Sequence, residues 1–113
     1  MGEPLEEMSQ IWKVFDEFEF DEDTSWHYYF DNKEIVSSDA SVKISYYKNK
    51  NKYLLLCVNS INKAVETQMF FSTGEWKIIS QVNVDDSSFK DNVMKCKFDG
   101  FGYKIVLIEK NEL

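Results

Sequence analysis

The chain of 113 residues has the length of one ordinary domain, and its composition describes an acidic, folded protein. Hydrophobic residues make up 43% of the chain and aromatic residues 16%, which is enough apolar surface to offset the entropy of ordering the backbone. Thirteen basic and twenty acidic side chains give a net charge of −7. Nucleic acids and anionic membranes are bound through clustered positive charge, so this charge excludes both as expected partners.

The sequence contains no segment that predicts membrane insertion or export. A membrane-spanning helix needs roughly 18 to 20 consecutive apolar residues, and the sequence has no run of that length. The first residues, Met1-Gly2-Glu3-Pro4, lack the basic and apolar regions of a signal peptide. We therefore expect a soluble chain, and the sequence indicates no compartment.

Residues 4–20 have the pattern of an amphipathic helix. Apolar residues recur at steps of three and four, which places them on one broad face. They are Leu5, Met8, Ile11, Trp12, Val14, Phe15 and Phe18. Pro4 suits the first helical turn, where its missing N–H costs no hydrogen bond. The acidic residues 21–23 would lie at the negative end of the helix dipole, so the helix is predicted to end near Phe20.

Residues 21–40 lack a clear period and are predicted to be an irregular crossing segment. They contain the densest aromatic patch in the chain, Trp26-His27-Tyr28-Tyr29-Phe30. From Val42 onward the period changes to two, which is typical of strands with one face inward. The predicted organisation is a helix or connector at residues 1–20 and a β-sandwich at residues 21–113, which together make one compact domain.

Six strands are predicted from this alternation, at residues 42–48, 52–59, 64–71, 76–84, 93–98 and 103–109. The second is apolar at nearly every position, which predicts a central strand covered on both sides. In the fifth, Met94, Cys96 and Phe98 are expected inside, with the lysines between them outside. A longer polar connection spans residues 85–92, and no parallel strand–helix–strand unit is visible. The fold class is therefore mainly β: an antiparallel β-sandwich or barrel of about six to seven strands, preceded by one N-terminal amphipathic helix.

No part of the sequence has the spacing of a catalytic or metal-binding motif. Cys57 and Cys96 each lie inside a predicted strand, so buried free thiols are expected, and a disulfide between them is the alternative. His27 is the single histidine, and without an evident partner it is not expected to be an acid–base catalyst. The acidic run lacks the glycine and the final glutamate of a calcium loop, so a solvated face is expected. It consists of Asp16, Glu17, Glu19, Asp21, Glu22 and Asp23. We therefore predict no catalytic residue, no metal, no cofactor and no enzymatic activity for this chain.

The order of the strands and a few of their residues resemble a known family. Ser45 and Tyr46 lie in the first predicted strand, and Asn59 ends the second. Trp76 opens the fourth strand, and residues 103–109 close the domain. This pattern is similar to the C-terminal β-sandwich accessory domain of TIM-barrel glycoside hydrolase-like proteins.

The resemblance covers residues 26–109 and implies a non-catalytic domain that packs against a catalytic barrel and supports it. The partner would be the catalytic domain of a parent glycoside hydrolase, and that barrel would carry the catalytic carboxylates. The helix at residues 4–20 would be the last barrel helix or the connector, and the chain would be a fragment of the parent. Part of the apolar helix face would then be exposed, which favours a homodimer as a further possibility.

Two other functions stay open at the level of the sequence. The first is an independent carbohydrate-binding module, in which Trp26, Tyr28 and Tyr29 stack on sugar rings with nearby Asp and Asn side chains as hydrogen-bond partners. Exposure of the three rings would favour this function, whereas burial would make them part of the core. The second is a small α+β ligand-binding domain similar to cystatin-like or nuclear-transport-factor-like proteins, in which one curved sheet and the helix enclose an apolar pocket.

Overall fold

The structure is a computed structural model that describes residues 3–82 and 88–111, with the side chains of residues 8–82 and 90–111. Within these residues the chain forms one α-helix, one short 3-10 helix and nine strands. Their bounds are α1 Glu3–Phe18, β1 Ser25–His27, η1 Tyr29–Asp31, β2 Ile35–Ser37, β3 Val42–Asn49, β4 Lys52–Asn59, β5 Val65–Phe71, β6 Glu75–Val82, β7 Ser88–Lys90, β8 Val93–Phe98 and β9 Tyr103–Asn111.

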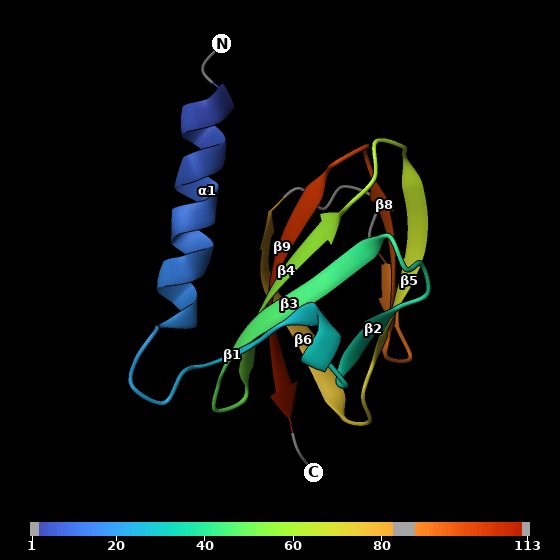
Figure 1. Ribbon diagram of the computed structural model, residues 1–113. Coiled ribbons are helices and arrows are strands. Elements are labelled where there is room, and N and C mark those ends of the chain that lie inside the picture. The colour runs from blue at the N-terminus through green and yellow to red at the C-terminus, as the bar shows by residue number, and fades with distance from the viewer. Residues whose placement is uncertain (1–2, 83–87, 112–113) are drawn as a thin grey trace.

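The strands form two antiparallel sheets, so the predicted β-sandwich is confirmed. Sheet A has the order β1-β3-β4-β9-β6, and sheet B has the order β2-β5-β8-β7. Figure 1 shows α1 standing against the side of sheet A that is remote from sheet B. The molecule therefore has three layers, one helix and two sheets. This arrangement differs from the single curved sheet expected for a cystatin-like or nuclear-transport-factor-like domain.

The main core lies between the two sheets and follows the alternation of the strands. Val42, Ile44 and Tyr46 of β3 point into it, as do Leu55 and Cys57 of β4. From sheet B, Met94, Cys96 and Phe98 of β8 are buried, while the lysines between them are exposed. The inward and outward faces predicted for residues 93–98 are confirmed, because the period of two places alternate side chains on opposite faces.

A second, smaller core lies between α1 and the outer face of sheet A. Val14 and Phe18 of the helix pack with Leu54, Ile105 and Leu107 of the sheet. The prediction that residues 52–59 form a central strand with both faces covered is confirmed: β4 is the middle strand of sheet A, Leu54 packs with α1, and Leu55 and Cys57 lie in the core between the sheets. β9 lies beside it and is buried along residues 104–108. Apolar runs without alternation therefore mark the two strands that lie between the helix and sheet B.

The prediction of an irregular segment at residues 21–40 is wrong in part. This segment contains β1, which pairs with β3 of sheet A, and β2, which pairs with β5 of sheet B. The segment does cross between the sheets, as expected. Each strand has only three residues, too few to show a period, and pairing with a long neighbour decides its conformation. The helix also ends at Phe18, two residues earlier than predicted, because Glu19 has the left-handed φ of 62° that commonly terminates a helix.

β6 departs from the regular alternation expected for residues 76–84. A β-bulge between Ile78 and Ser80 shifts its register against β9. Ile78 consequently packs against the core between the sheets, whereas Val82 packs under α1. The predicted end of this strand at Val84 lies outside the described residues, and the predicted connection at residues 85–92 contains β7. Among the described residues, no helix combines the length and apolar character needed to cross a membrane.

Candidate functional site

The three residues predicted to bind sugar lie together on one side of the sandwich. Trp26 belongs to β1, Tyr28 precedes η1, and Tyr29 is the first residue of η1. The side chain of Asn32 holds this turn in place: its Nδ2 donates to the carbonyl of Ile44 at 3.0 Å, and its Oδ1 accepts from the backbone N–H of Ile35 at 2.9 Å. A single polar side chain thus ties η1 to one strand of each sheet.

Three of the four rings of Trp26, Tyr28, Tyr29 and Phe30 are exposed. Tyr28 is 52% exposed, Tyr29 48% and Phe30 69%, whereas Trp26 is half-buried. Phe30 was not among the predicted residues, although it continues the same aromatic run. Its ring stacks on that of Tyr28 with a centroid distance of 5.3 Å and an interplanar angle of 6°. The cluster is therefore an exposed feature of the surface and not part of either core.

The rings do not form one flat platform. The plane of Trp26 stands at 81° to that of Tyr28, at a centroid distance of 5.3 Å. Trp26 also packs on Tyr47 of β3, with centroids 4.5 Å apart. The ammonium of Lys43 lies 5.2 Å above the ring of Tyr29 and occupies one of its faces. Tyr28 and Phe30 offer exposed ring surface, while Trp26 anchors the cluster to sheet A.

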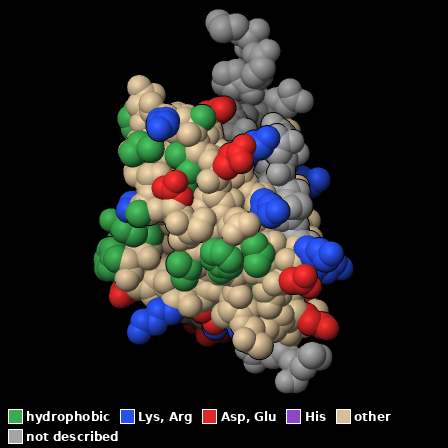
Figure 2. All heavy atoms as spheres, turned by 90° about the vertical axis from the view of Figure 1, so that its right-hand side faces the viewer, with side chains coloured by type: hydrophobic (Ala, Val, Ile, Leu, Met, Phe, Trp, Pro, Cys, Tyr) green, Lys and Arg blue, Asp and Glu red, His purple; other side chains and the backbone are tan. Residues whose placement is uncertain are grey.

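The exposed apolar surface continues from η1 onto sheet B. A hollow between η1 and β2 is lined by both Tyr29 and Val36. Val36 pairs with Phe70 of β5, and both side chains are exposed. We call Tyr28, Tyr29, Phe30, Val36 and Phe70 the η1–β5 strip. Figure 2, which faces sheet B, shows hydrophobic side chains along the left edge and across the middle of this face. Contiguous exposed apolar surface of this kind commonly marks a binding site.

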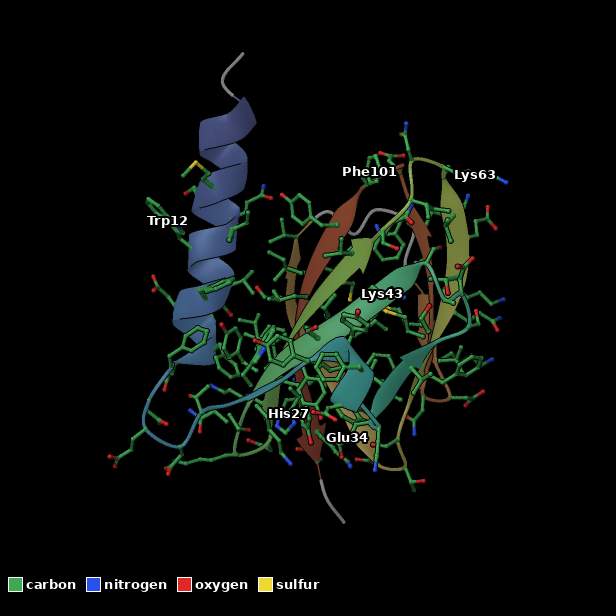
Figure 3. The ribbon with its side chains drawn as sticks, viewed as in Figure 1. Trp12, His27, Glu34, Lys43, Lys63 and Phe101 are labelled. Atoms are coloured by element: carbon green, nitrogen blue, oxygen red, sulfur yellow. The ribbon has the colours of Figure 1, made fainter. Side chains whose placement is uncertain are left out.

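A second exposed apolar feature lies on α1. Met8 and Trp12 are one helical turn apart, and both are exposed, Trp12 to 65%. Figure 3 shows the Trp12 side chain pointing away from the sheets. The apolar face predicted for the helix is therefore divided: Ile11, Val14, Phe15 and Phe18 face sheet A, and Met8 and Trp12 do not.

His27 has a neighbour that the sequence analysis missed. Its Nε2 lies 2.8 Å from the hydroxyl of Ser25, because residues two apart on a strand point the same way. The imidazole also stacks on Tyr46, with centroids 4.6 Å apart and planes at 13°. Among the described residues no carboxylate is hydrogen-bonded to this histidine. Ser25 and His27 therefore lack, in this part of the chain, the acidic residue that would orient the histidine in a catalytic triad. Those residues also contain no group of three or more side chains that could hold a metal ion.

Both cysteines are buried in the core between the sheets, as predicted, and no disulfide joins them. The Sγ of Cys57 lies 3.8 Å from the Sδ of Met69. Burial, together with the nearby Cys96, raises the pKa of the Cys57 thiol far above its usual range. A thiol in this environment is a small hydrophobic group and not a nucleophile.

Polar groups meet at the end of the sandwich that carries the C-terminal part of β9. The Nζ of Lys110 lies 3.7 Å from Glu34 and 3.3 Å from the hydroxyl of Ser72, and it stands 5.2 Å above the ring of Trp76. Burial, together with the charge of Glu34, raises the pKa of the Tyr46 hydroxyl. Because Glu34 precedes β2 and Lys110 belongs to β9, this cluster ties sheet B to sheet A, which is a structural role.

The fold and these surfaces define a class of protein: a helix-covered β-sandwich with exposed apolar surface on two sides. Comparison with models of protein families, with curated proteins and with solved structures finds no match to this chain. Its function is therefore argued from the geometry of the surfaces.

Proposed function

We propose that the chain is a non-catalytic accessory β-sandwich domain that packs against the catalytic barrel of a glycoside hydrolase and supports it. The observation that carries this proposal is the divided helix face, with Trp12 65% exposed one turn after the exposed Met8. A helix that served only to cover sheet A would need one apolar face. Large exposed aromatic side chains beside other apolar residues are typical of surfaces that a partner covers. The resemblance of residues 26–109 to accessory domains of glycoside hydrolase-like proteins favours a catalytic barrel as this partner.

We expect an interface centred on Trp12, because a tryptophan at the centre of an interface commonly contributes much of the binding energy. The test uses the TIM-barrel domain of a glycoside hydrolase encoded with or beside this chain, purified separately. Addition of the chain should raise the melting temperature of the barrel and shift the Trp12 fluorescence to shorter wavelength. Trp12→Ser should weaken binding by about thirtyfold, measured by isothermal titration calorimetry.

Phe101 provides a matched control for this variant. It is 63% exposed, like Trp12, but it lies on the loop between β8 and β9, away from α1 (Figure 3). Phe101→Ser should bind the barrel as the wild type does. An unchanged melting temperature of the barrel, with no heat of binding, would contradict the proposal. A chain that forms a dimer through Trp12 instead, seen by sedimentation, would replace the barrel with a second copy as the partner.

The η1–β5 strip favours a second candidate function, carbohydrate binding by an independent module. The specific observation is the exposure of Tyr28, Tyr29 and Phe30, because exposed aromatic rings can stack on the apolar faces of sugar rings. Trp26 would hold the ring of Tyr28 in position through their contact, in which the ring centroids are 5.3 Å apart. This candidate needs no partner domain, so the two functions can be tested separately.

The carbohydrate test is a fluorescence titration with a panel of neutral oligosaccharides, in which Trp26 reports on the neighbouring Tyr28. A saturable shift that Tyr28→Ala removes would support the module. Tyr28→Ala is the decisive variant because Tyr28 is exposed, whereas Trp26→Ala would also remove the packing against Tyr47. Phe101→Ala, which truncates an exposed ring elsewhere, should leave the shift intact. A flat titration of the folded wild type would rule out this candidate.

A further inference from the structure

The outer face of sheet B is uncovered in the part of the chain that the structure describes. α1 packs on β4, β6 and β9, all of which belong to sheet A. On sheet B, alternate residues of β5 and β8 point away from the core and are exposed. Figure 2 looks onto this face and shows charged side chains of both signs above the hydrophobic band.

The outward side chains of β5 and β8 form a ladder of facing pairs. Glu66 faces Lys97, Gln68 faces Lys95, and Phe70 faces Val93. An open hollow of about 560 Å³ lies beside the first two of these pairs. It is lined by Ser38, Glu66, Thr67, Gln68, Lys95, Cys96 and Lys97. This volume is within the range of small-ligand sites, and the lining consists mostly of side chains that donate or accept hydrogen bonds.

The rim of the hollow is fixed by a network around the buried hydroxyl of Thr67. This hydroxyl lies 3.1 Å from that of Ser38 and accepts from the backbone N–H of Asp39 at 3.2 Å. The Ser38 hydroxyl in turn accepts from the backbone N–H of Gln68 at 3.1 Å. Hydrogen bonds from Ser41 hold the pKa of Asp39 below its usual value, so the loop keeps its charge. A ligand at this rim would meet polar groups that are already positioned, which lowers the entropic cost of binding.

The charge of this face differs from that of the whole chain. Lys90, Lys95 and Lys97 are exposed on it, against the carboxylates of Glu66 on β5 and of Asp39 in the adjoining loop. Lys97 lies 3.8 Å from Glu66, in a pair that is exposed on both sides and therefore weak. Lys95 has no ion-pair partner among the described residues. In a chain with a net charge of −7, this local excess of lysine attracts an anion.

We propose that the outer face of sheet B binds an acidic oligosaccharide. Lys95 and Lys97 would bind its anionic groups, Gln68 and Ser38 its hydroxyl groups, and Phe70 the apolar face of a neighbouring sugar ring. The lining favours a glycan over an acidic peptide, because the hollow lacks the buried apolar anchor that protein partners commonly use. β5 is also hydrogen-bonded to β2 and β8, so it offers little free edge for a peptide strand. The proposal stands whether or not α1 packs on a catalytic barrel.

The test is calorimetric titration of the full chain with four probes at low salt. Two are acidic glycans, hexagalacturonate with carboxylates and a heparin-derived hexasaccharide with sulfates, and they distinguish the two sources of negative charge. The others are cellohexaose, which is neutral, and a poly-glutamate peptide. We expect an acidic glycan to bind, Lys95→Gln to weaken it by about tenfold, and 0.3 M salt to weaken it several-fold.

Lys13→Gln is the matched control, because it removes one positive charge from an exposed position on α1. It should leave the affinity within about twofold of the wild type, and both variants should melt as the wild type does, since both side chains are exposed. Three results would overturn the proposal: no binding of either acidic glycan, equal weakening by Lys13→Gln and Lys95→Gln, or binding of poly-glutamate alone. Cellohexaose binding as tight as that of the acidic glycans, and unchanged by Tyr28→Ala, would also overturn it, because the outer face of sheet B would then not select for charge.

Discussion

Phe18→Ala is expected to lower the free energy of unfolding by about 3–5 kcal/mol and the melting temperature by roughly 10–20 °C. Phe18 is fully buried at the end of α1 and packs in the cluster that contains Leu54 and Leu107. Its ring is in edge contact with that of Phe20, with centroids 4.8 Å apart. Truncation removes the most deeply buried aromatic side chain that α1 places against sheet A. A single domain of this size has a total stability of about 5–15 kcal/mol, so the loss is a large fraction of it.

The loss should affect the whole domain and not the helix alone. Leu54, Ile105 and Leu107 are buried because α1 lies over them, and detachment of the helix would expose all three to water. β4 and β9 also form the centre of sheet A, so their exposure weakens the layer on which the main core depends. We therefore expect circular dichroism and tryptophan fluorescence to report a single, coincident transition at the lower temperature.

Trp12→Ala is the control, since it removes an even larger ring from the same helix. Trp12 is exposed, so this variant should unfold within about 0.5 kcal/mol of the wild type. If Phe18→Ala instead melts like Trp12→Ala, the helix does not pack on sheet A in solution. The pair also supports the docking test, because it checks that variants of Trp12 remain folded.

Periodicity was sufficient to predict the long strands and the sides they bury. β3, β5 and β8 alternate over six to eight residues, and alternate side chains of each lie in the core between the sheets, as a period of two predicts. Three features could not be found this way. β1 and β2 are too short to show a period, and the bulge in β6 depends on its pairing with β9, which lies far away in the sequence. The alternation along a single strand predicts which of its side chains point inward. Where short strands form and where the register shifts depends on pairing between distant segments.

The candidate surfaces were predictable to a smaller extent. The aromatic run at residues 26–30 indicated where exposed rings lie, but the angle between Trp26 and Tyr28 follows from the packing of Trp26 on Tyr47. Val36 and Phe70 are each single apolar residues on an outward face. Their meeting depends on the register of β2 against β5, which joins segments about thirty residues apart. The lysine-rich face of sheet B requires the order of its strands, which the sequence analysis did not give.

Asn59, which ends the second predicted strand, links two loops through its side-chain amide. It ends β4 and is fully buried. Its Nδ2 donates to the carbonyl of Lys63 at 2.8 Å and to that of Asp99 at 3.0 Å, and its Oδ1 accepts from the N–H of Ile61 at 3.3 Å. The Lys63 loop joins β4 to β5, and the Asp99 loop joins β8 to β9, so both loops cross between the sheets. The side-chain amide of Asn59 therefore links the two loops that connect the sheets.

Asn59→Ala is expected to lower the free energy of unfolding by about 2–4 kcal/mol, because two part-buried carbonyl groups lose their donor and the buried amide leaves a cavity. Urea denaturation measures this loss. Hydrogen exchange should show faster exchange at Phe101, whose backbone N–H donates to the carbonyl of Ile61 at 2.8 Å across the two loops. Asn62→Ala removes the same group from an exposed neighbouring position and should change the stability by less than about 0.5 kcal/mol. Equal stability of the two variants would mean that the two crossings are held together without this amide.

Asn59→Asp separates the loss of hydrogen bonds from the loss of volume. The new carboxylate has the shape of the amide but faces two carbonyl oxygens, so at neutral pH this variant should be less stable than Asn59→Ala. Protonation restores one donor and removes the charge, so the folded state binds the proton more tightly than the unfolded state does. Stability of the variant should therefore rise relative to the wild type as the pH falls toward about 4, and fall again as the pH is raised. A difference from the wild type that does not change with pH would show that the carboxylate has turned away from the loops.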